Sequence, residues 1–252
     1  MEKGKNIQCL DRALDLLELL AEEHNLGATD ISKKMGLHVA TAHNIVRTLA
    51  ARGYVLNLDG KYSLGPGAAL LARGWNPVTS LADVVDSHLK NISQNTGEAA
   101  SATVLLGNEA HLIGFCAGTQ EITIHFPSWH WPNPLGLATG KVLLAYSGKS
   151  LQEEVLEKNK QHLGQSPEEL KTLFSAIKDA GYYERISDSE NGQYAVAFPL
   201  KTAGNRVVAA MGASCPLFRP TTEHRKFMRE FVQVEAQTLS SKLGWQPNRP
   251  TN

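Results

Sequence analysis

Residues 30–54, "DISKKMGLHVATAHNIVRTLAARGY", most strongly constrain the fold, because they join two short helical patterns through one glycine and end close to another. The first helix is expected from Ala28 to Met35, with Gly27 or Thr29 as its N-cap. Gly36 suits the left-handed conformation that often ends a helix. The spacing therefore predicts a helix–turn–helix unit.

The second helix of this unit is expected from Val39 to Arg52, with Gly53 ending it. Apolar side chains recur at helical spacing and are expected to face inward; they are Ala42, Ile45, Val46 and Leu49. The opposite side carries small and polar side chains, namely Ala40, His43, Asn44, Arg47, Thr48 and Ala51. This outer side either contacts a partner or is simply the solvated side of a helix.

A helix is also expected before this unit, over residues 7–22. Its apolar stripe is expected to consist of Leu10, Ala13, Leu14, Leu17, Leu20 and Ala21. Leu16 and Leu19 make the stripe wider than a small domain needs. Two explanations stay open: a well-buried helix, or a second contact surface for another copy of the chain.

The segment "YVLNLDGKYSLG" follows the third helix and is typical of a β-hairpin. Apolar residues alternate on both sides of Asp59-Gly60, a dipeptide that favours a two-residue hairpin turn. Three helices followed by a hairpin predict a winged helix, and this order is more specific than a helix–turn–helix alone.

The remainder predicts a second domain in which helices and strands are mixed, so the fold class is α/β (α+β). A helix is expected from Ser80 to about Gln94 and another from Thr222 to Leu243. Strands are expected at residues 100–107, 109–115, 121–126, 194–200 and 206–214, and helices at residues 139–146, 151–160 and 167–180. The expected domains are 1–65 (winged helix), 66–79 (linker helix), 80–244 (second domain) and 245–252 (flexible tail).

Charge and cysteine content limit the possible functions. The chain has 25 Lys and Arg residues against 25 Asp and Glu residues, and residues 1–75 carry nine against eight. DNA binding would therefore depend on a few locally placed cations and would weaken strongly with salt. Three scattered cysteines favour a reducing compartment. With acids in the first apolar pattern and no stretch long enough to cross a bilayer, the expected location is the cytoplasm.

Six fragments in order along the chain resemble the IclR family of bacterial transcriptional regulators. In the first domain they are "LDRALDLLELLAE", "ISKKMGLHVATAHNIVRTLAARGYV" and "GKYSLGP". In the second they are "ATGKVLLAY", "AGYYERISDSENGQYAVAFPL" and "NRVVAAMGAS". The resemblance implies an N-terminal winged helix, a C-terminal GAF-like effector-binding domain, and a homodimer or homotetramer that binds double-stranded promoter DNA. It implies no cofactor, no membrane and no enzymatic activity.

The residues expected to contact DNA lie mainly on the outer side of the third helix. Asn44 suits a bidentate pair with adenine, and Arg47 suits guanine or a phosphate. Thr41 and His43 lie near the start of that helix. The expected phosphate contacts are Thr29, Lys33 and Lys61. Family members often have a basic residue and a serine where this chain has Val39 and Ala40, which indicates a different target sequence.

The segment "GLATGKV" is a candidate ligand site, although it is not a P-loop because its glycines are too close together and Val142 follows the lysine. Backbone N–H groups at the start of the following helix are suited to a carboxylate, and the alternative is a plain helix cap. By position in the family, the effector contacts are expected from Ala138, Gly140, Arg185, Ala195 and Ser214.

The effector is expected to be a small organic acid, possibly aromatic, because Trp129 and Trp131 lie in an aromatic-rich stretch that could line a pocket. Packing against another subunit is the alternative for these side chains. Ala195 replaces a common cysteine, Arg185 replaces a common acidic residue, and the loop before Gly140 is one residue short, so the keto acids of the family are not assumed.

Other classes of function have weaker support in the sequence. There is no G-x-S-x-G nucleophile motif, and Cys116 and Cys215 lie in apolar strand patterns where buried thiols are ordinary. Cys116, His125 and His130 give only a weak zinc pattern, so no metal is expected. The remaining alternatives are a small-molecule enzyme with an appended winged helix, and a protein-interaction adaptor.

Overall fold

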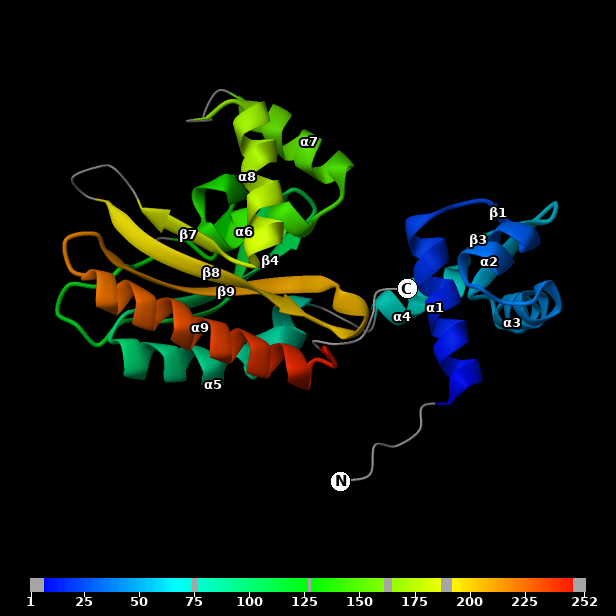
Figure 1. Ribbon diagram of the computed structural model, residues 1–252, viewed down its shortest axis with the longest axis horizontal. Coiled ribbons are helices and arrows are strands. Elements are labelled where there is room, and N and C mark those ends of the chain that lie inside the picture. The colour runs from blue at the N-terminus through cyan, green and yellow to red at the C-terminus, as the bar shows by residue number, and fades with distance from the viewer. Residues whose placement is uncertain (1–6, 74–76, 127, 161–164, 187–191, 247–252) are drawn as a thin grey trace. The chain divides into compact units, whose positions relative to one another are not determined.

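The computed structural model describes residues 7–73, 77–126, 128–160, 165–186 and 192–246 of the 252-residue chain. The chain forms two compact units that meet in sequence between residues 76 and 77. The first unit is mainly helical, and the second combines a sheet with helices (Figure 1).

In its described residues, the N-terminal unit has four helices and a small antiparallel sheet. The helices are α1 (Gln8–Glu22), α2 (Ala28–Lys34), α3 (Val39–Ala51) and α4 (Pro66–Arg73). The strands are β1 (Leu26–Gly27), β2 (Val55–Leu58) and β3 (Lys61–Leu64), in the order β1-β3-β2. The predicted helix–turn–helix and the hairpin after it are therefore both present.

Two turns in this unit depend on backbone conformations that few residues adopt. Gly36 ends α2 with a φ of 62°, as its place in the sequence predicts. In the β2–β3 hairpin, Asp59 and Gly60 have φ values of 52° and 80°, the pair of positive angles that a type I′ turn requires.

The core of the N-terminal unit confirms the inward side of α3 but corrects that of α1. Fully or nearly buried apolar side chains from all three leading helices pack together, including Leu16, Leu20, Ile31, Ala42 and Val46. The predicted stripe of α1 was wrong at Leu10 and Leu14, which are 57% and 52% exposed, and at Ala21, which is also exposed. Helix α1 has apolar residues on two sides, and tertiary packing selects the side around Leu16 and Leu20.

The C-terminal unit has a six-stranded antiparallel sheet in the order β6-β5-β4-β9-β8-β7. Its strands are β4 (Ala99–Leu106), β5 (Glu109–Cys116), β6 (His130–Trp131), β7 (Tyr183–Ile186), β8 (Gln193–Lys201) and β9 (Val207–Pro216). The long central pair β8–β9 keeps one register from Gln193↔Pro216 to Leu200↔Ala209. The two halves of the sheet thus come from segments far apart in the chain.

Helices cover both faces of this sheet (Figure 1). One face packs on α5 (Pro77–Thr96) and α9 (Thr222–Lys242). The other packs on α6 (Ala138–Tyr146), α7 (Lys149–Lys158) and α8 (Pro167–Ala180), with the short 3-10 turn η1 (Pro134–Gly136) leading into α6. Alternate residues of each central strand therefore enter two separate cores.

A polar network built on two buried side chains, His88 and Glu235, joins the two helices of the first face. The carboxylate of Glu235 on α9 accepts a hydrogen bond from the amide of Asn91 and lies 2.6 Å from Nδ1 of His88, both on α5. The ammonium of Lys242 lies 3.0 Å from the other ring nitrogen of His88. Because every polar group in it has a partner, the network fixes the register of α5 against α9.

Three predictions about local structure in this unit were wrong. Residues 121–126 do not form a strand, and the edge of the sheet is the short strand β6 instead. Strand β7 was not predicted. Helix α5 begins at Pro77 rather than Ser80.

Trp245, the first residue of the predicted tail, is held against the rest of the C-terminal unit. The indole N–H of Trp245 donates to the side chain of Asn205 at 3.1 Å, and the ammonium of Lys201 lies over its ring. The turn η3 (Ala203–Asn205) is thus held against the end of α9. Residues 247–252 of the predicted tail, and residues 74–76 of the predicted linker, lie outside the described residues.

Among the described residues, no helix is both long and apolar enough to span a bilayer.

Candidate functional site

The outer side of α3 presents polar side chains to solvent. Asn44, His43 and Arg47 are all exposed, while Ala42 and Val46 on the opposite side are buried in the core. The hydroxyl of Thr48 donates to the carbonyl of Asn44 at 2.8 Å, so it satisfies the helix backbone. Packing through one side thus leaves an amide and a guanidinium free to face a partner.

The other predicted contact residues lie on α2, on the first turn of α3 and on the hairpin of the N-terminal unit. Thr29 and Lys33 are exposed on α2, and Lys61 is exposed at the start of β3. Thr41 is half-buried in the first turn of α3. Both α2 and the hairpin share a core with α3 and carry exposed cations. Helix α3 has the size that enters a major groove.

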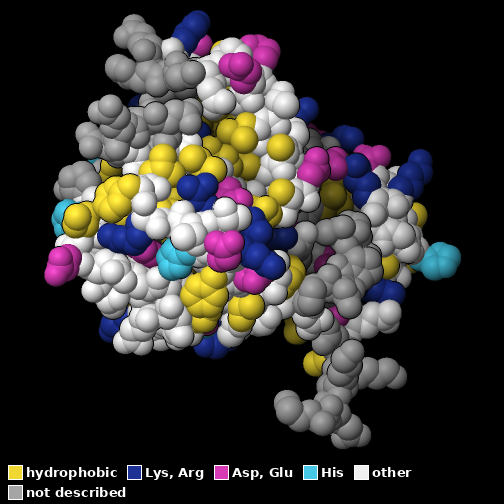
Figure 2. All heavy atoms as spheres, turned by 60° about the vertical axis from the view of Figure 1, so that its left-hand side comes forward, with side chains coloured by type: hydrophobic (Ala, Val, Ile, Leu, Met, Phe, Trp, Pro, Cys, Tyr) yellow, Lys and Arg dark blue, Asp and Glu magenta, His cyan; other side chains and the backbone are white. Residues whose placement is uncertain are grey.

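Charges of both signs are mixed elsewhere on the molecule. On the face drawn in Figure 2, Lys and Arg side chains alternate with Asp and Glu side chains and with hydrophobic patches. This mixture agrees with the formal net charge of zero. Attraction to a polyanion must then come from a few local cations rather than from the whole molecule.

A small pocket lies in the C-terminal unit between the sheet and the start of α6. Its free volume is about 20 Å³, close to the space that one water molecule needs. The lining residues are Ser101, Phe126, Leu137, Ala138, Thr139, Gln193, Ala195, Val196, Gly212, Ala213 and Ser214. The pocket is thus lined by small and hydroxyl side chains from three neighbouring strands and by one aromatic ring.

The start of α6 gives this pocket its polar wall. Its N-cap residue is Leu137, and no side chain among the described residues caps the helix. Leu137 and Ala138 line the pocket together with Ser101 and Ser214, so the positive end of the helix dipole adjoins this space. A helix N-terminus with serine hydroxyl groups on the opposite wall of the pocket is suited to binding a carboxylate.

Three of the seven residues predicted for the effector site, Ala138, Ala195 and Ser214, line this pocket together. Trp129 does not, because it is 61% exposed. Trp131 does not line the pocket either, but its ring packs edge-on against that of Phe126, which does, with the ring centroids 6.1 Å apart.

Gly140 and Arg185 support the pocket from outside it. A Cβ at Gly140 would lie 2.0 Å from the carbonyl oxygen of Pro134, so the glycine allows η1 to pack against α6. The guanidinium of Arg185 donates to the carbonyl of Gly136 at 2.8 Å and thereby ties β7 to the same turn. Both residues position the segment that carries Leu137 and Ala138.

Sequence reasoning missed Ser101, Thr139 and Gln193. Ser101 could have been predicted from the sequence. Ser101 and Thr103 are hydroxyl residues two apart in an otherwise apolar strand, so their side chains must lie on the same face of the sheet. The structure joins Thr103 to Thr139, whose hydroxyl oxygens are 2.8 Å apart. Two polar residues in alternate positions of a buried strand thus indicate which face of the sheet lines the pocket.

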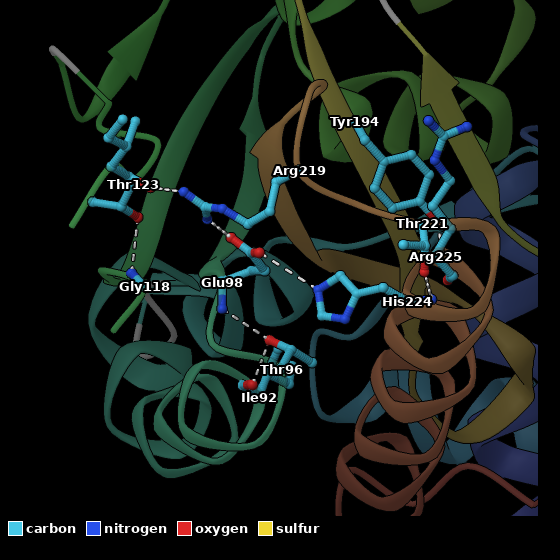
Figure 3. Close-up of polar contacts among 11 residues, drawn as sticks. Ile92, Thr96, Glu98, Gly118, Thr123, Tyr194, Arg219, Thr221, His224 and Arg225 are labelled. Atoms are coloured by element: carbon cyan, nitrogen blue, oxygen red, sulfur yellow. Dashed lines mark hydrogen bonds and ion pairs between the residues drawn. The ribbon is translucent and has the colours of Figure 1, made fainter. Parts of the chain in front are cut away.

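A buried ion pair fastens the loop that carries Phe126 (Figure 3). Glu98 is 1% exposed, and its carboxylate lies 2.5 Å from the guanidinium of Arg219 and 3.4 Å from the ring of His224. The same guanidinium donates to the carbonyl of Ile122. The connection between β9 and α9 is thereby linked to the loop before β6.

The geometry does not favour Cys215 as a nucleophile. Cys215 is fully buried, and burial raises the pKa of its thiol to about 12, with the charge of Glu98 acting in the same direction. A thiol with that pKa is protonated near neutral pH and is a poor nucleophile. The apolar strand pattern around Cys215 is therefore a feature of the core.

Comparison with known proteins decides the family. Residues 9–58 match the model of the IclR helix-turn-helix domain, and residues 77–241 match the model of the bacterial transcriptional regulator IclR C-terminal domain. The chain belongs to the IclR family of bacterial transcriptional regulators. It is therefore an IclR-type regulator with a helix-turn-helix domain and a C-terminal effector domain.

Individual relatives agree with this assignment. The chain is 31% identical to the HTH-type transcriptional regulator XynR of Escherichia coli K12, over 95% of this chain and 98% of that protein. The structure of an IclR regulator from Silicibacter sp. TM1040 superposes with a TM-score of 0.61 at 20% identity, covering 96% and 100% of the two chains.

A further solved relative carries a ligand. It is an IclR homolog from Microbacterium hydrocarbonoxydans in complex with 4-hydroxybenzoate. It is 26% identical, with a TM-score of 0.55 over 93% of this chain and 99% of that one. These known IclR relatives are regulators, and the match extends through both units of the chain.

Proposed function

We propose that this IclR-family regulator binds double-stranded promoter DNA through the outer side of α3, with α2 and the β2–β3 hairpin contacting the flanking phosphates. The supporting observation is that Asn44 and Arg47 are exposed on the second helix of a helix–turn–helix. In this arrangement Asn44 pairs with adenine and Arg47 with guanine. Thr41 and His43 contact bases or backbone, and Thr29, Lys33 and Lys61 contact phosphates.

The test is a gel-shift titration with the DNA upstream of the regulator's own gene. The parent protein is expected to shift this DNA at lower concentration than a scrambled duplex of the same length. Asn44→Ala is expected to reduce this preference, whereas Lys171→Ala, on the exposed side of α8, is a charge-removing control that leaves it unchanged. Equal binding of both duplexes by the parent protein contradicts the proposal.

The effector we propose is a small organic acid, with an aromatic acid as the preferred class. The carboxylate of the acid would lie at the start of α6, beside Ala138 and the hydroxyl of Ser214. The apolar part of the acid would contact Ala195 and Phe126. Gly140, Arg185 and Trp131 hold the walls of this pocket, and Trp129 is a contact only if its loop closes. The complex of a relative with 4-hydroxybenzoate supports an aromatic acid here.

An acid of this size needs more room than the pocket offers. Its free volume of about 20 Å³ holds one water, whereas small-molecule sites usually measure about 300 Å³ or more. Binding must therefore separate α6 or the Phe126 loop from the sheet. The ligand would then bind the opened state of the protein more tightly than the closed state. Regulation by a ligand requires such a difference in affinity between two states.

Thermal shift with a panel of benzoates, hydroxybenzoates and short keto acids tests this assignment. At least one aromatic acid is expected to raise the melting temperature, and Ser214→Val is expected to abolish the rise. Ser175→Val, an exposed position on α8, is the matched control. Stabilisation by none of the acids, or an equal effect on both variants, contradicts the pocket assignment.

We also propose that the regulator is a homodimer or homotetramer in the cytoplasm. Exposed apolar side chains gather on α1 and α4, where Ile7, Leu10, Leu14, Leu70 and Leu71 are between 52% and 66% exposed. Exposed apolar groups of this kind favour contact with a second copy of the chain. Two copies would place two α3 helices on half-sites about one helical turn apart.

A further inference from the structure

One cluster of side chains lies outside both proposed sites. Glu109 and His111 are two residues apart on β5, so they share one face of that strand. His130 on the edge strand β6 is the register partner of His111. The fold therefore brings two imidazoles and one carboxylate together from segments that are about twenty residues apart.

The distances within this cluster are short enough for a shared ion. One ligand atom from each of the three residues lies within 4.8 Å of the others. The carboxylate Oε2 of Glu109 is 2.6 Å from Nε2 of His130. The rings of His111 and His130 are stacked, with centroids 4.7 Å apart.

The chemistry of the three groups matches a particular class of cation. Two histidine nitrogens and one carboxylate are a common ligand set for zinc, and they leave a fourth position of the tetrahedron for water. Hard cations such as Ca²⁺ and Mg²⁺ prefer oxygen ligands only. With Glu109 and His111 half-buried and His130 exposed, an ion can enter from solvent while two of its ligands are held by the fold.

A neighbouring pair of side chains orients the carboxylate. The ammonium of Lys158 at the end of α7 donates to Oε1 of Glu109 at 2.8 Å and to the side-chain carbonyl of Asn108 at 2.9 Å. Oε2 is left facing His130. Contacts of this kind to the second oxygen of a ligand are the usual support around a metal centre.

We propose that Glu109, His111 and His130 form a binding site for a divalent transition metal ion of the zinc class. The ion would lie between the Glu109 carboxylate and the two imidazoles and would join the edge strand β6 to β5. Trp131, next to His130, packs on Phe126, which lines the acid pocket. Metal binding therefore stabilises the segment beside that pocket, although the site itself is separate from it.

The experiment is isothermal titration of the chelator-treated full-length protein with zinc chloride. One ion per chain is expected to bind. His111→Ala, His130→Ala and Glu109→Gln are each expected to weaken binding by roughly tenfold or more. His125→Ala is the matched control, because His125 lies five residues before His130 and outside the cluster, and it is expected to bind zinc as the parent does.

A second measurement separates this site from a cysteine site and from loss of folding. Cobalt(II) in place of zinc is expected to give tetrahedral absorption bands without a thiolate charge-transfer band. Unfolding by urea in chelator is expected to be similar in the parent and Glu109→Gln. The proposal is overturned if the parent binds no zinc below millimolar concentration. It is equally overturned if the three variants bind as the parent does, or if His125→Ala loses binding to the same degree.

Discussion

At the scale of single residues, side chains and glycines that touch no ligand determine much of the pocket. Gly140 illustrates this, because the carbonyl of Pro134 occupies the space where any Cβ would lie. Gly140→Ala is expected to lower the free energy of unfolding by about 1–3 kcal/mol, since α6 must move away from η1. Urea unfolding followed by circular dichroism measures the change.

The control for this substitution is Gly148→Ser at the N-cap of α7. Nothing lies within 4 Å of a Cβ at Gly148, and serine is a favoured N-cap residue. Its stability is expected to stay within about 0.5 kcal/mol of the parent. If Gly140→Ala unfolds at the same urea concentration as the parent, the close packing of η1 on α6 does not matter for stability.

Single residues also show what the sequence predicted of the sites and what it did not. Ala138, Ala195 and Ser214 were predicted by position and do line one pocket. Arg185 and Gly140 do not line the pocket but contact the turn η1 beside it. No local sequence pattern reveals these contacts, so these two roles could not be predicted. The three residues of the proposed metal site were not grouped from the sequence, because His130 comes beside His111 only through the pairing of β6 with β5, which spacing along the chain does not reveal.

At the scale of elements, periodicity predicted the structure well where one side of an element is buried. Helix α3 and the β2–β3 hairpin were confirmed, because the apolar pattern and the positions of the glycines indicate the same element boundaries. Helix α1 is apolar on two sides, so the predicted stripe was right at Leu17 and Leu20 but wrong at Leu10 and Leu14. Residues 121–126 alternate like a strand but have no partner strand, and Ile122 is 59% exposed.

The loop before β6 provides a test at this scale, because the buried pair of Glu98 and Arg219 holds it. Glu98→Gln is expected to lower the free energy of unfolding by about 2–4 kcal/mol, since the guanidinium loses its buried counter-charge. The loop is also expected to be cleaved faster by a protease under native conditions. Chemical denaturation and limited proteolysis measure the two effects.

Glu121→Gln is the matched control, because Glu121 is an exposed carboxylate in the same loop. Its unfolding and its cleavage rate are expected to equal those of the parent. Should Glu98→Gln behave in the same way as this control, the ion pair does not fasten the loop.

At the scale of the whole molecule, the zero formal charge makes a specific prediction about salt. A neutral protein that binds DNA through a few local cations should lose affinity linearly with the logarithm of salt concentration. The slope is expected to be about −0.9 for each phosphate contacted. Replacing Lys33 and Lys61 together by Ala should make the slope shallower by roughly two in each chain, as measured by fluorescence anisotropy at several salt concentrations. A slope that does not change removes both lysines from the interface.

The central claim is that the outer side of α3 distinguishes one DNA sequence from another. The most direct test measures the affinity of the parent and of Arg47→Ala for the operator and for operators with single base changes, at one fixed salt concentration. The parent is expected to discriminate against one G·C replacement by roughly 1–3 kcal/mol, and Arg47→Ala is expected to lose that discrimination. If Arg47→Ala still selects the operator as sharply as the parent at every position, Arg47 does not contact a base and the account of α3 is contradicted.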